Sequence, residues 1–284
     1  MAAVAGLTLA ACGGGGSGDA AAPPVAEDTT FEAGTTMARL AEAGSINIGT
    51  KFDQPLFGLQ GLSGEPEGFD VEIAKIIAGG LGIEPENINW TETPSATREE
   101  VIQQGRVDMV VATYTINDAR KERISFAGPY YEAGQTLMVR SDNTTVTGPE
   151  SLRESGARVC SVSGSTPSQN ILEYIDPAQL TLFDTYSLCA DALRTNQVDV
   201  VTTDNVILLG FVNDSDGAFK LVGEPFTGEP YGIGITKGDV AFCEFINTTL
   251  REAAESGAYA EAWESTAGQV AEETPKLPEL DPCS

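Results

Sequence analysis

The stretch 107–120 combines residue types that could together bind a small anion. It opens as an apolar run typical of a buried strand and turns polar at Thr113 and Thr115, and Asn117 then gives a helix-start signal. Such a junction brings hydroxyls, free backbone N–H groups and the positive end of a helix dipole together. Arg120, one turn into the expected helix, adds a planar fork of donors that matches a carboxylate or a phosphate. The alternative is an ordinary strand–helix connection with a solvated arginine.

The composition of the chain narrows the function classes. With 16 basic and 42 acidic residues the net charge is −26, which argues against nucleic acid or an anionic membrane surface as a partner. A local cluster of Lys and Arg can still oppose that field and bind a small anion. The chain contains no histidine, which removes Ser-His and Cys-His nucleophile pairs and most zinc sites. We therefore expect neither a metal nor a cofactor, and a length of 284 residues favours two domains.

Residues 1–12 have the character of a signal segment. A short apolar run ends in Leu9-Ala10-Ala11-Cys12, which resembles a bacterial lipobox, where the cysteine is lipidated and becomes the mature N-terminus. No Lys or Arg precedes the run, which departs from the usual signal pattern, and the alternative is an alanine-rich tail with a stray thiol. Residues 13–35, which begin with a Gly-, Ala-, Ser- and Pro-rich segment, are expected to form a flexible tether.

The four remaining cysteines are expected to form two disulfides, because their number is even and the chain reads as exported. Three connectivities are possible. We favour Cys160–Cys189 and Cys243–Cys283, since each pair then lies within one predicted domain. The alternative is four buried free thiols.

The order of expected elements is that of an α/β protein. The first half is predicted to contain a helix over 37–43, a strand over 45–50, a helix over 69–81 broken by Gly79, Gly80 and Gly82, a strand over 88–91, a helix over 97–104 with Ser95 as N-cap, and the strand and helix start of 107–120. The second half is predicted to contain extended crossings over 129–139 and 225–235, strands over 158–162 and 198–202, and helices opening at Pro167, over 187–195, 240–257 and 258–267. In such sheets, ligands bind beyond the C-terminal ends of the strands.

A short internal repeat supports two units of similar design. The segment 105–110 parallels the segment 196–201, and each follows an expected helix and opens a strand that ends in threonines. The repeat is too short to establish a duplication, but it fits two α/β lobes.

The segment Gly68-Phe69-Asp70-Val71-Glu72-Ile73, followed by Ile77, Ala78 and Leu81, resembles the signature of the family 3 bacterial extracellular solute-binding proteins. The similarity runs from about Ser45 to Trp263 and is greatest to the glutamate/aspartate-binding branch. This resemblance implies a two-lobed, periplasmic-binding-protein-like fold of type II, with two crossing strands as the hinge. It implies lobe 1 over 36–131 and 230–270, lobe 2 over 132–229, and a C-terminal tail over 271–284.

The same resemblance implies a monomeric, non-enzymatic protein. It would be held outside the cytoplasm on the cell membrane by its lipid anchor. It would capture glutamate or aspartate between its lobes and deliver it to the membrane subunits of an ABC importer. Two alternatives remain: an anchored amino-acid sensor that signals to a membrane partner, and a lyase-type enzyme on the same fold that uses Glu173, Tyr131 or Tyr186.

The resemblance also implies a set of ligand-binding residues. For the α-carboxylate it implies Arg120, Thr115 and Thr113 from the first lobe and Gly164, Ser165 and Thr166 from the second. For the α-ammonium it implies Asp204, with Asn205 beside it. For an acidic side chain it implies Lys51 and Arg98, with Ser95.

Each of these assignments has a structural alternative. Arg98 could pair with Glu99 or Glu100, Lys51 could be a solvated loop lysine, and Asp204 could serve as an N-cap for 205–209. Tyr186 and Gln54 are further candidates that could equally be surface or core residues.

Overall fold

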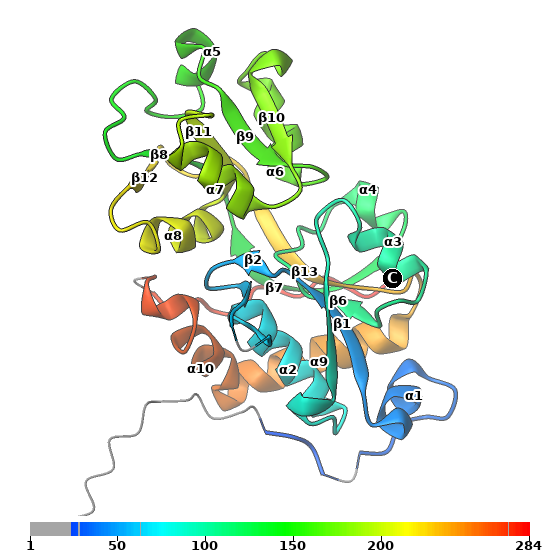
Figure 1. The fold of residues 1–284 in the computed structure, drawn as a ribbon. Coiled ribbons are helices and arrows are strands. Elements are labelled where there is room, and N and C mark those ends of the chain that lie inside the picture. Colours follow the sequence, from blue (N-terminus) through cyan, green and yellow to red (C-terminus); the bar gives the residue numbers. More distant parts are fainter. Residues whose placement is uncertain (1–23, 28, 63, 272) are drawn as a thin grey trace, which may run out of the picture.

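The computed structural model describes residues 24–27, 29–62, 64–271 and 273–284. The predicted lipidation site Cys12 and most of the expected tether therefore lie outside the described residues. The described chain forms two lobes, each built on a five-stranded sheet, and a further three-stranded sheet. We call the lobe that contains β1 the first lobe and the lobe that contains β9 the second lobe, which lies above the first in Figure 1.

The first lobe contains the sheet β5-β1-β6-β13-β7 and the small sheet β2-β3-β4. Its strands are β1 (Ile46–Thr50), β2 (Asp53–Gln54), β3 (Gly58–Gln60), β4 (Pro66–Glu67), β5 (Ile88–Glu92), β6 (Met109–Val110), β7 (Ser125–Ala133) and β13 (Glu229–Ile235). Its helices are α1 (Thr36–Ala43), α2 (Phe69–Gly80), α3 (Arg98–Gln103), α4 (Asp118–Lys121), α9 (Val240–Ser256) and α10 (Ala258–Glu264), with 3₁₀ turns over Pro85–Asn87 and Ala267–Gln269.

The second lobe contains the sheet β10-β9-β11-β8-β12. Its strands are β8 (Gln135–Arg140), β9 (Val159–Val162), β10 (Leu180–Phe183), β11 (Val200–Asp204) and β12 (Phe219–Val222). Its helices are α5 (Ser151–Ser155), α6 (Thr166–Asn170), α7 (Tyr186–Arg194) and α8 (Asn205–Asn213), with 3₁₀ turns over Ile171–Glu173 and Pro177–Gln179.

The two large sheets share one topology. In the first, β1 pairs in parallel with β5 and β6, and β13 runs antiparallel to β6 and β7. In the second, β9 pairs in parallel with β10 and β11, and β8 runs antiparallel to β11 and β12. A ligand site is expected beyond the C-terminal ends of the parallel strands in each lobe.

The internal repeat marks equivalent positions in the two lobes. Asp108 Oδ2 accepts a hydrogen bond of 2.9 Å from the N–H of Asn47, in the parallel neighbour β1. Asp199 Oδ2 accepts a bond of the same length from the N–H of Arg158, which leads into the parallel neighbour β9. The repeated Val-Asp pair therefore aligns two parallel strands in both lobes.

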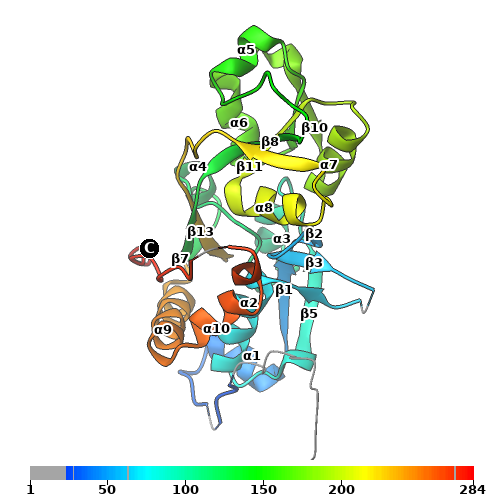
Figure 2. The ribbon, with the colours of Figure 1, turned by 90° about the vertical axis from the view of Figure 1, so that its left-hand side faces the viewer.

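The chain crosses between the lobes twice. β7 ends at Ala133 in the first sheet, and β8 begins at Gln135 in the second. The return runs from Val222, the end of β12, to Glu229, the start of β13. Figure 2, turned by 90°, shows β13 and β7 reaching up to the boundary between the lobes. The crossing predicted over 129–139 contains the first connection, and the one predicted over 225–235 contains the second from residue 225 onward.

Two glycines predicted to break the second helix lie inside it. α2 continues through Gly79 and Gly80, and Gly82 with a φ of 77° follows its end. A Cβ at Gly79 would lie 2.8 Å from the carbonyl oxygen of Pro24, and one at Gly80 would lie 3.2 Å from Phe245 and Thr249 side-chain atoms. The two glycines therefore permit close packing rather than ending the helix.

The prediction that Ser95 caps α3 is wrong. The helix begins at Arg98, and the residue at its N-cap position is Thr97. A turn precedes it, in which the N–H of Thr97 donates to the carbonyl of Pro94 at 3.0 Å, and Ser95 lies inside this turn. The hydroxyl of Ser95 instead accepts a hydrogen bond from Lys51.

The strand predicted over 198–202 is displaced by two residues, since β11 runs from Val200 to Asp204.

Each lobe contains one disulfide, and the two disulfides are the pairs favoured from the sequence. Cys160 of β9 is bonded to Cys189 of α7 in the second lobe. Cys243 of α9 is bonded to Cys283, which lies with Leu277 and Leu280 against the first-lobe core.

Among the described helices, none is both long and apolar enough to cross a membrane.

Candidate functional site

A cavity lies between the lobes. Its volume of about 10 Å³ is roughly the space of one water, so the lobes must move apart before a larger molecule can enter this cavity. Its lining residues are Ser95, Arg98, Thr113, Thr115, Ser165, Thr166, Pro167, Tyr186, Thr203, Asp204 and Ile207. The first lobe also has two larger hollows. One is lined mainly by apolar side chains near Val25, and the other contains the ion pair of Glu72 and Lys75.

Of the ten residues predicted to bind the ligand, seven line this cavity, and Lys51, Arg120 and Gly164 do not. Tyr186, a further candidate, also lines it, whereas Gln54 does not. Gln54 instead accepts a hydrogen bond of 3.0 Å from the hydroxyl of Thr113.

Asp204 presents a carboxylate oxygen to the cavity. It stands at the end of β11 and at the N-cap position of α8, but its side chain makes no capping bond to that helix. Oδ2 accepts a bond of 2.6 Å from the hydroxyl of Tyr231, and no donor among the described residues reaches Oδ1. The side chain is 2% exposed, and burial, followed by the charge of Glu229, raises the pKa of Asp204 to about 8. An ammonium group beside Oδ1 would therefore donate a hydrogen bond to this buried oxygen and balance the charge of the ionised carboxylate.

Arg98 presents a guanidinium to the same cavity. It is the first residue of α3 and is 2% exposed. Nη1 donates to the carbonyl of Ala112 at 2.8 Å, and the guanidinium lies over the ring of Tyr114 at 4.1 Å from the centroid. Nε has no hydrogen-bond partner among the described residues. The alternative pairing with Glu99 does not occur, because the carboxylate of Glu99 contacts Arg120 at 3.3 Å and Arg123 at 3.8 Å.

Lys51 lies directly beside this group. It follows β1, is 2% exposed, and donates from Nζ to Ser95 Oγ at 2.9 Å. Burial, followed by the nearby charge of Arg98, lowers the pKa of Lys51 to about 7. Within the described part of the chain, neither Lys51 nor Arg98 forms an ion pair. Two neighbouring buried cations without a paired acid form a site suited to an anion.

Arg120 is positioned as expected but is held by protein groups. Asn117 caps α4 by accepting a bond of 2.9 Å from the N–H of Arg120. The guanidinium donates to the carbonyl of Thr115 at 2.6 Å and, across the lobe boundary, to the carbonyl of Gly164 at 3.2 Å. Burial, followed by the charge of Arg98, lowers its pKa to about 10, which leaves it protonated at neutral pH. A direct bond from Arg120 to a ligand stays a prediction.

Hydroxyl groups from both lobes meet at the cavity. Thr115 Oγ1 and Thr166 Oγ1 are 3.2 Å apart, and the latter donates to Glu229 at 2.7 Å. Ser165 caps α6 by accepting from the N–H of Ser168 at 3.1 Å. The turn 163–166 is therefore ordered by its own hydrogen bonds before any ligand contact.

Thr113 is held by a buried acid that the sequence did not point to. Its φ is 44°, in the left-handed region, and its N–H donates to Asp70 Oδ2 at 2.7 Å. Asp70 also accepts a bond of 2.5 Å from the hydroxyl of Tyr130, and burial raises its pKa to about 7. Four further residues were missed: Pro167, Thr203 and Ile207, which line the cavity, and Tyr231, which bonds Asp204. The threonines that end the repeated strands were the available signal for Thr203 alone.

The described residues contain no cluster of three or more His, Cys, Asp or Glu side chains able to hold a metal ion. The cavity instead combines a lone carboxylate, a guanidinium and several hydroxyls, all contributed by two lobes of like topology. This arrangement is that of a two-lobed binding protein for a small polar solute.

Comparisons with known proteins agree with this class. The model of the bacterial extracellular solute-binding proteins, family 3, matches residues 46–267, and the chain belongs to this family. It is 39% identical to the glutamate-binding protein GluB of Corynebacterium efficiens, over 91% of this chain and 85% of that protein. It is 38% identical to the glutamine-binding protein GlnH of the ABC transporter of Bacillus subtilis, over 90% of this chain and 91% of that protein.

A solved structure of an ancestral arginine-binding protein bound to glutamine is 33% identical in sequence, with a TM-score of 0.73. The match covers 78% of this chain and 97% of that one. The resemblance derived from the sequence is thereby confirmed at the level of the family and the two-lobed fold. The chain is thus a member of the solute-binding family, and the two relatives named here are a glutamate-binding and a glutamine-binding protein.

Proposed function

We propose that the protein captures an acidic amino acid, glutamate or aspartate, between its lobes and delivers it to the membrane subunits of an ABC importer. In this proposal the chain is lipid-anchored through Cys12 on the outer side of the cell membrane. The single observation that carries the choice of ligand is the pair of buried cations, Arg98 and Lys51, which lack an acidic partner within ion-pair distance in the described residues.

The charges of the site match those of an acidic amino acid. The unpartnered Oδ1 of Asp204 suits the ammonium group. The hydroxyls of Thr113, Thr115 and Thr166 would donate to the α-carboxylate after turning from their present acceptors, Gln54, Thr166 and Glu229. Arg120 holds the carbonyl groups of Thr115 and Gly164 in place. Arg98 and Lys51 then remain for a second carboxylate, which closure of the lobes would remove from water.

Sequence identity does not decide between an acid and an amide as the ligand. The chain is 39% identical to the glutamate-binding relative and 38% identical to the glutamine-binding relative. The charge of the site supports the acid, since glutamate and glutamine have nearly the same shape and differ in charge. Asp70 is the opposing influence, because its carboxyl lies close enough for Arg98 and Lys51 to lower its pKa. Burial outweighs them and raises that pKa to about 7, so near neutral pH Asp70 supplies only part of a negative charge. Lys51, whose pKa burial lowers to about 7, likewise supplies only part of a positive charge, so Arg98 is the full cation of the pair.

Binding without reaction fits the site better than catalysis does. Of the acid–base groups that a lyase-type enzyme could use, Glu173 is exposed and Tyr131 stacks on Trp263 at 5.1 Å, and neither lines the cavity. Tyr186 does line it, but burial raises the pKa of Tyr186 to about 12, so it stays protonated. Asp204, the one carboxylate in the lining, is needed by the ammonium.

A calorimetric titration series with glutamate, aspartate, glutamine, asparagine and arginine tests the proposal. The expected result is tighter binding of each acid than of its amide, by at least about 2 kcal/mol or roughly thirtyfold. Tightest binding of an amide or of arginine would contradict it. The genes adjacent to this one separate delivery to an importer from signalling to a membrane sensor, because only the former requires permease and ATPase subunits.

A further inference from the structure

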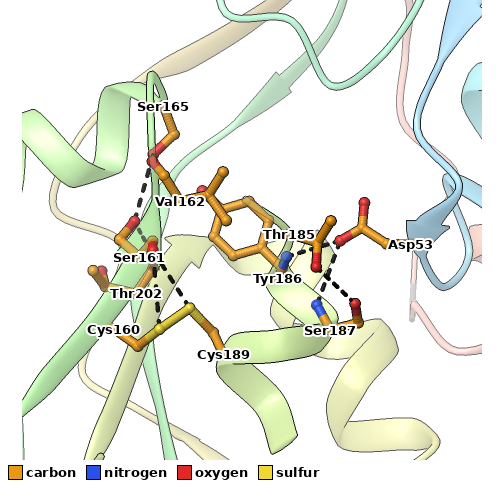
Figure 3. Close-up of a disulfide and its surroundings, with 10 residues drawn as sticks. All are labelled: Asp53, Cys160, Ser161, Val162, Ser165, Thr185, Tyr186, Ser187, Cys189 and Thr202. Atoms are coloured by element: carbon orange, nitrogen blue, oxygen red, sulfur yellow. Dashed lines mark hydrogen bonds between the residues drawn. A yellow bond between two sulfur atoms is a disulfide. The ribbon is translucent and has the colours of Figure 1, made fainter. Parts of the chain in front are cut away.

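A side chain of the first lobe caps a helix of the second lobe. Asp53, in β2, accepts bonds with Oδ2 from the N–H groups of Tyr186 at 2.8 Å and Ser187 at 3.4 Å (Figure 3). These residues open α7, whose own N-cap residue, Thr185, makes no capping bond with its side chain. The hydroxyl of Thr185 lies instead 3.0 Å from that of Ser187. The first turn of α7 thus has its acceptor on the other lobe.

The capped helix is fixed to the part of the second lobe that reaches the cavity. Cys189 of α7 is bonded to Cys160 of β9, and β9 leads directly into the turn 163–166 (Figure 3). Tyr186, whose N–H Asp53 accepts, itself lines the cavity. A contact made at the start of α7 is therefore connected rigidly to the ligand-facing turn.

A second close approach lies next to the first. In α8 of the second lobe, a Cβ added at Gly210 would lie 2.7 Å from the carbonyl oxygen of Pro55, which follows β2. Gly210 thus allows the segment 53–55 of the first lobe to enter between α7 and α8. Neither Asp53 nor Gly210 lines the cavity, so neither is placed to contact a ligand there.

We infer that Asp53, Pro55, Gly210 and the first turn of α7 form a closure joint, which sets the affinity for every amino-acid ligand by stabilising the closed arrangement of the lobes. This inference rests on the proposed function for the identity of the ligands. A ligand that touches both lobes gains apparent affinity from any contact made only when they are closed. Because Asp53, Pro55 and Gly210 lie outside the cavity lining, the contacts they make change all affinities by the same factor and leave selectivity unchanged.

Asp53→Ala removes the cap, and relative to Asp53→Asn, which loses the same charge, it is expected to weaken glutamate, aspartate and glutamine binding alike, by about three- to thirtyfold. Asp53→Asn keeps an acceptor oxygen of equal capping ability and is expected to retain most of the affinity. This second variant also separates the cap from the charge of Asp53, which raises the pKa of Lys51. Asp239→Ala is the matched control, since Asp239 caps α9 within the first lobe by accepting from the N–H of Phe242 at 3.0 Å. It should leave all three affinities unchanged.

Gly210→Ala tests the joint from the other side. Alanine has the higher helix propensity, so α8 itself is expected to be stabilised, while the added Cβ obstructs the approach of Pro55. The variant should therefore bind every amino acid more weakly although its thermal stability is equal or higher. The thermal-stability measurement excludes unfolding of the variant as the cause of weaker binding.

The decisive experiment is calorimetry with the three amino acids on the wild type and these four variants, combined with hydrogen exchange at the amides of Tyr186 and Ser187. A uniform loss in Asp53→Ala and Gly210→Ala, with faster exchange in the former, is expected. Loss for one ligand only, equal loss in Asp53→Asn and Asp53→Ala, or no loss would overturn the joint. If the wild type bound no amino acid, the proposed function would fail separately. The joint would then be overturned by unchanged amide exchange in Asp53→Ala, and supported by faster exchange there but not in Asp239→Ala.

Discussion

The hydroxyl of Tyr231 donates to Asp204 Oδ2 at 2.6 Å, and Oδ1 of this cavity-lining residue has no donor among the described residues. Tyr231 belongs to β13, the strand that returns the chain to the first lobe, whereas Asp204 ends a strand of the second lobe. The proposed ammonium acceptor is thus held by the other lobe. Asp70 also accepts from a tyrosine of a crossing strand, Tyr130 of β7, but both of these residues belong to the first lobe.

Tyr231→Phe is expected to weaken the binding of every amino acid by about ten- to a hundredfold. The substitution removes one hydrogen bond to a charged, buried carboxylate, which contributes roughly 1.5–3 kcal/mol. It also raises the pKa of Asp204 further, so the loss should grow as the pH falls. Calorimetry at pH 6 and pH 8.5 measures both effects. Tyr259→Phe is the control, since the Tyr259 hydroxyl bonds the Tyr130 carbonyl at 2.8 Å and does not touch Asp204.

Glutamate affinity is expected to be greatest between about pH 7 and 8. Asp204, with a pKa of about 8, must be ionised to accept an ammonium, so affinity falls as the pH drops below that value. Lys51, with a pKa of about 7, must be protonated to attract a carboxylate, so affinity falls as the pH rises above 7. Lys51→Met should remove the alkaline decline and keep the acid one. A profile that is flat from pH 5 to 9 would contradict these assignments.

Asp204→Asn is expected to stabilise the protein in the absence of amino acids while abolishing their binding. The folded-state pKa of Asp204 is raised above its unfolded value. Its contribution to the free energy of unfolding is therefore complete below about pH 4 and is lost as the pH rises through about 8. Asparagine cannot ionise, so the gain should be roughly 2–5 kcal/mol at pH 9 and near zero at pH 4. Denaturant titrations at the two pH values measure it, and a loss of stability at pH 9 would count against the burial of a charge at this position.

Cys12→Ser is expected to release the protein from membranes without changing its ligand affinity. Stable anchoring requires more than one acyl chain, and serine cannot carry the thioether-linked lipid, so the shift to the soluble fraction should be nearly complete. Fractionation of cells that express each form measures this. Persistence of the variant in the membrane fraction would rule out the lipobox interpretation of Leu9–Cys12.

Features set by short-range signals could be predicted from the sequence. Asn117 caps α4 as expected, because the capping residue and the helix it caps are neighbours in the chain. The Val-Asp repeat predicted two similar lobes, and it marks equivalent strand contacts at Asp108 and Asp199. Ser95 was assigned as a cap by the same kind of signal, and the assignment failed because a turn shifted the helix start to Arg98.

Features that depend on distant contacts could not be predicted. Tyr231 meets Asp204 across 27 residues, and Asp53 meets Tyr186 across 133. Spacing within the chain carries no information about such pairs, because they arise only when two lobes pack together. The carbonyl partners of Arg120 are of the same kind. Its residue type predicted an anion-binding fork, but the fold directs two of its nitrogens to backbone carbonyls.

The preference of the site for an acid over its amide is the most direct test of ligand recognition by Arg98 and Lys51. We would measure the dissociation constants of glutamate and glutamine by calorimetry for the wild type, Arg98→Ala and Lys51→Ala. The wild type is expected to prefer glutamate by at least about thirtyfold, and each substitution is expected to weaken glutamate binding far more than glutamine binding, so that the preference narrows. Equal weakening of both ligands in both variants, or a wild type that binds glutamine as tightly as glutamate, would contradict it.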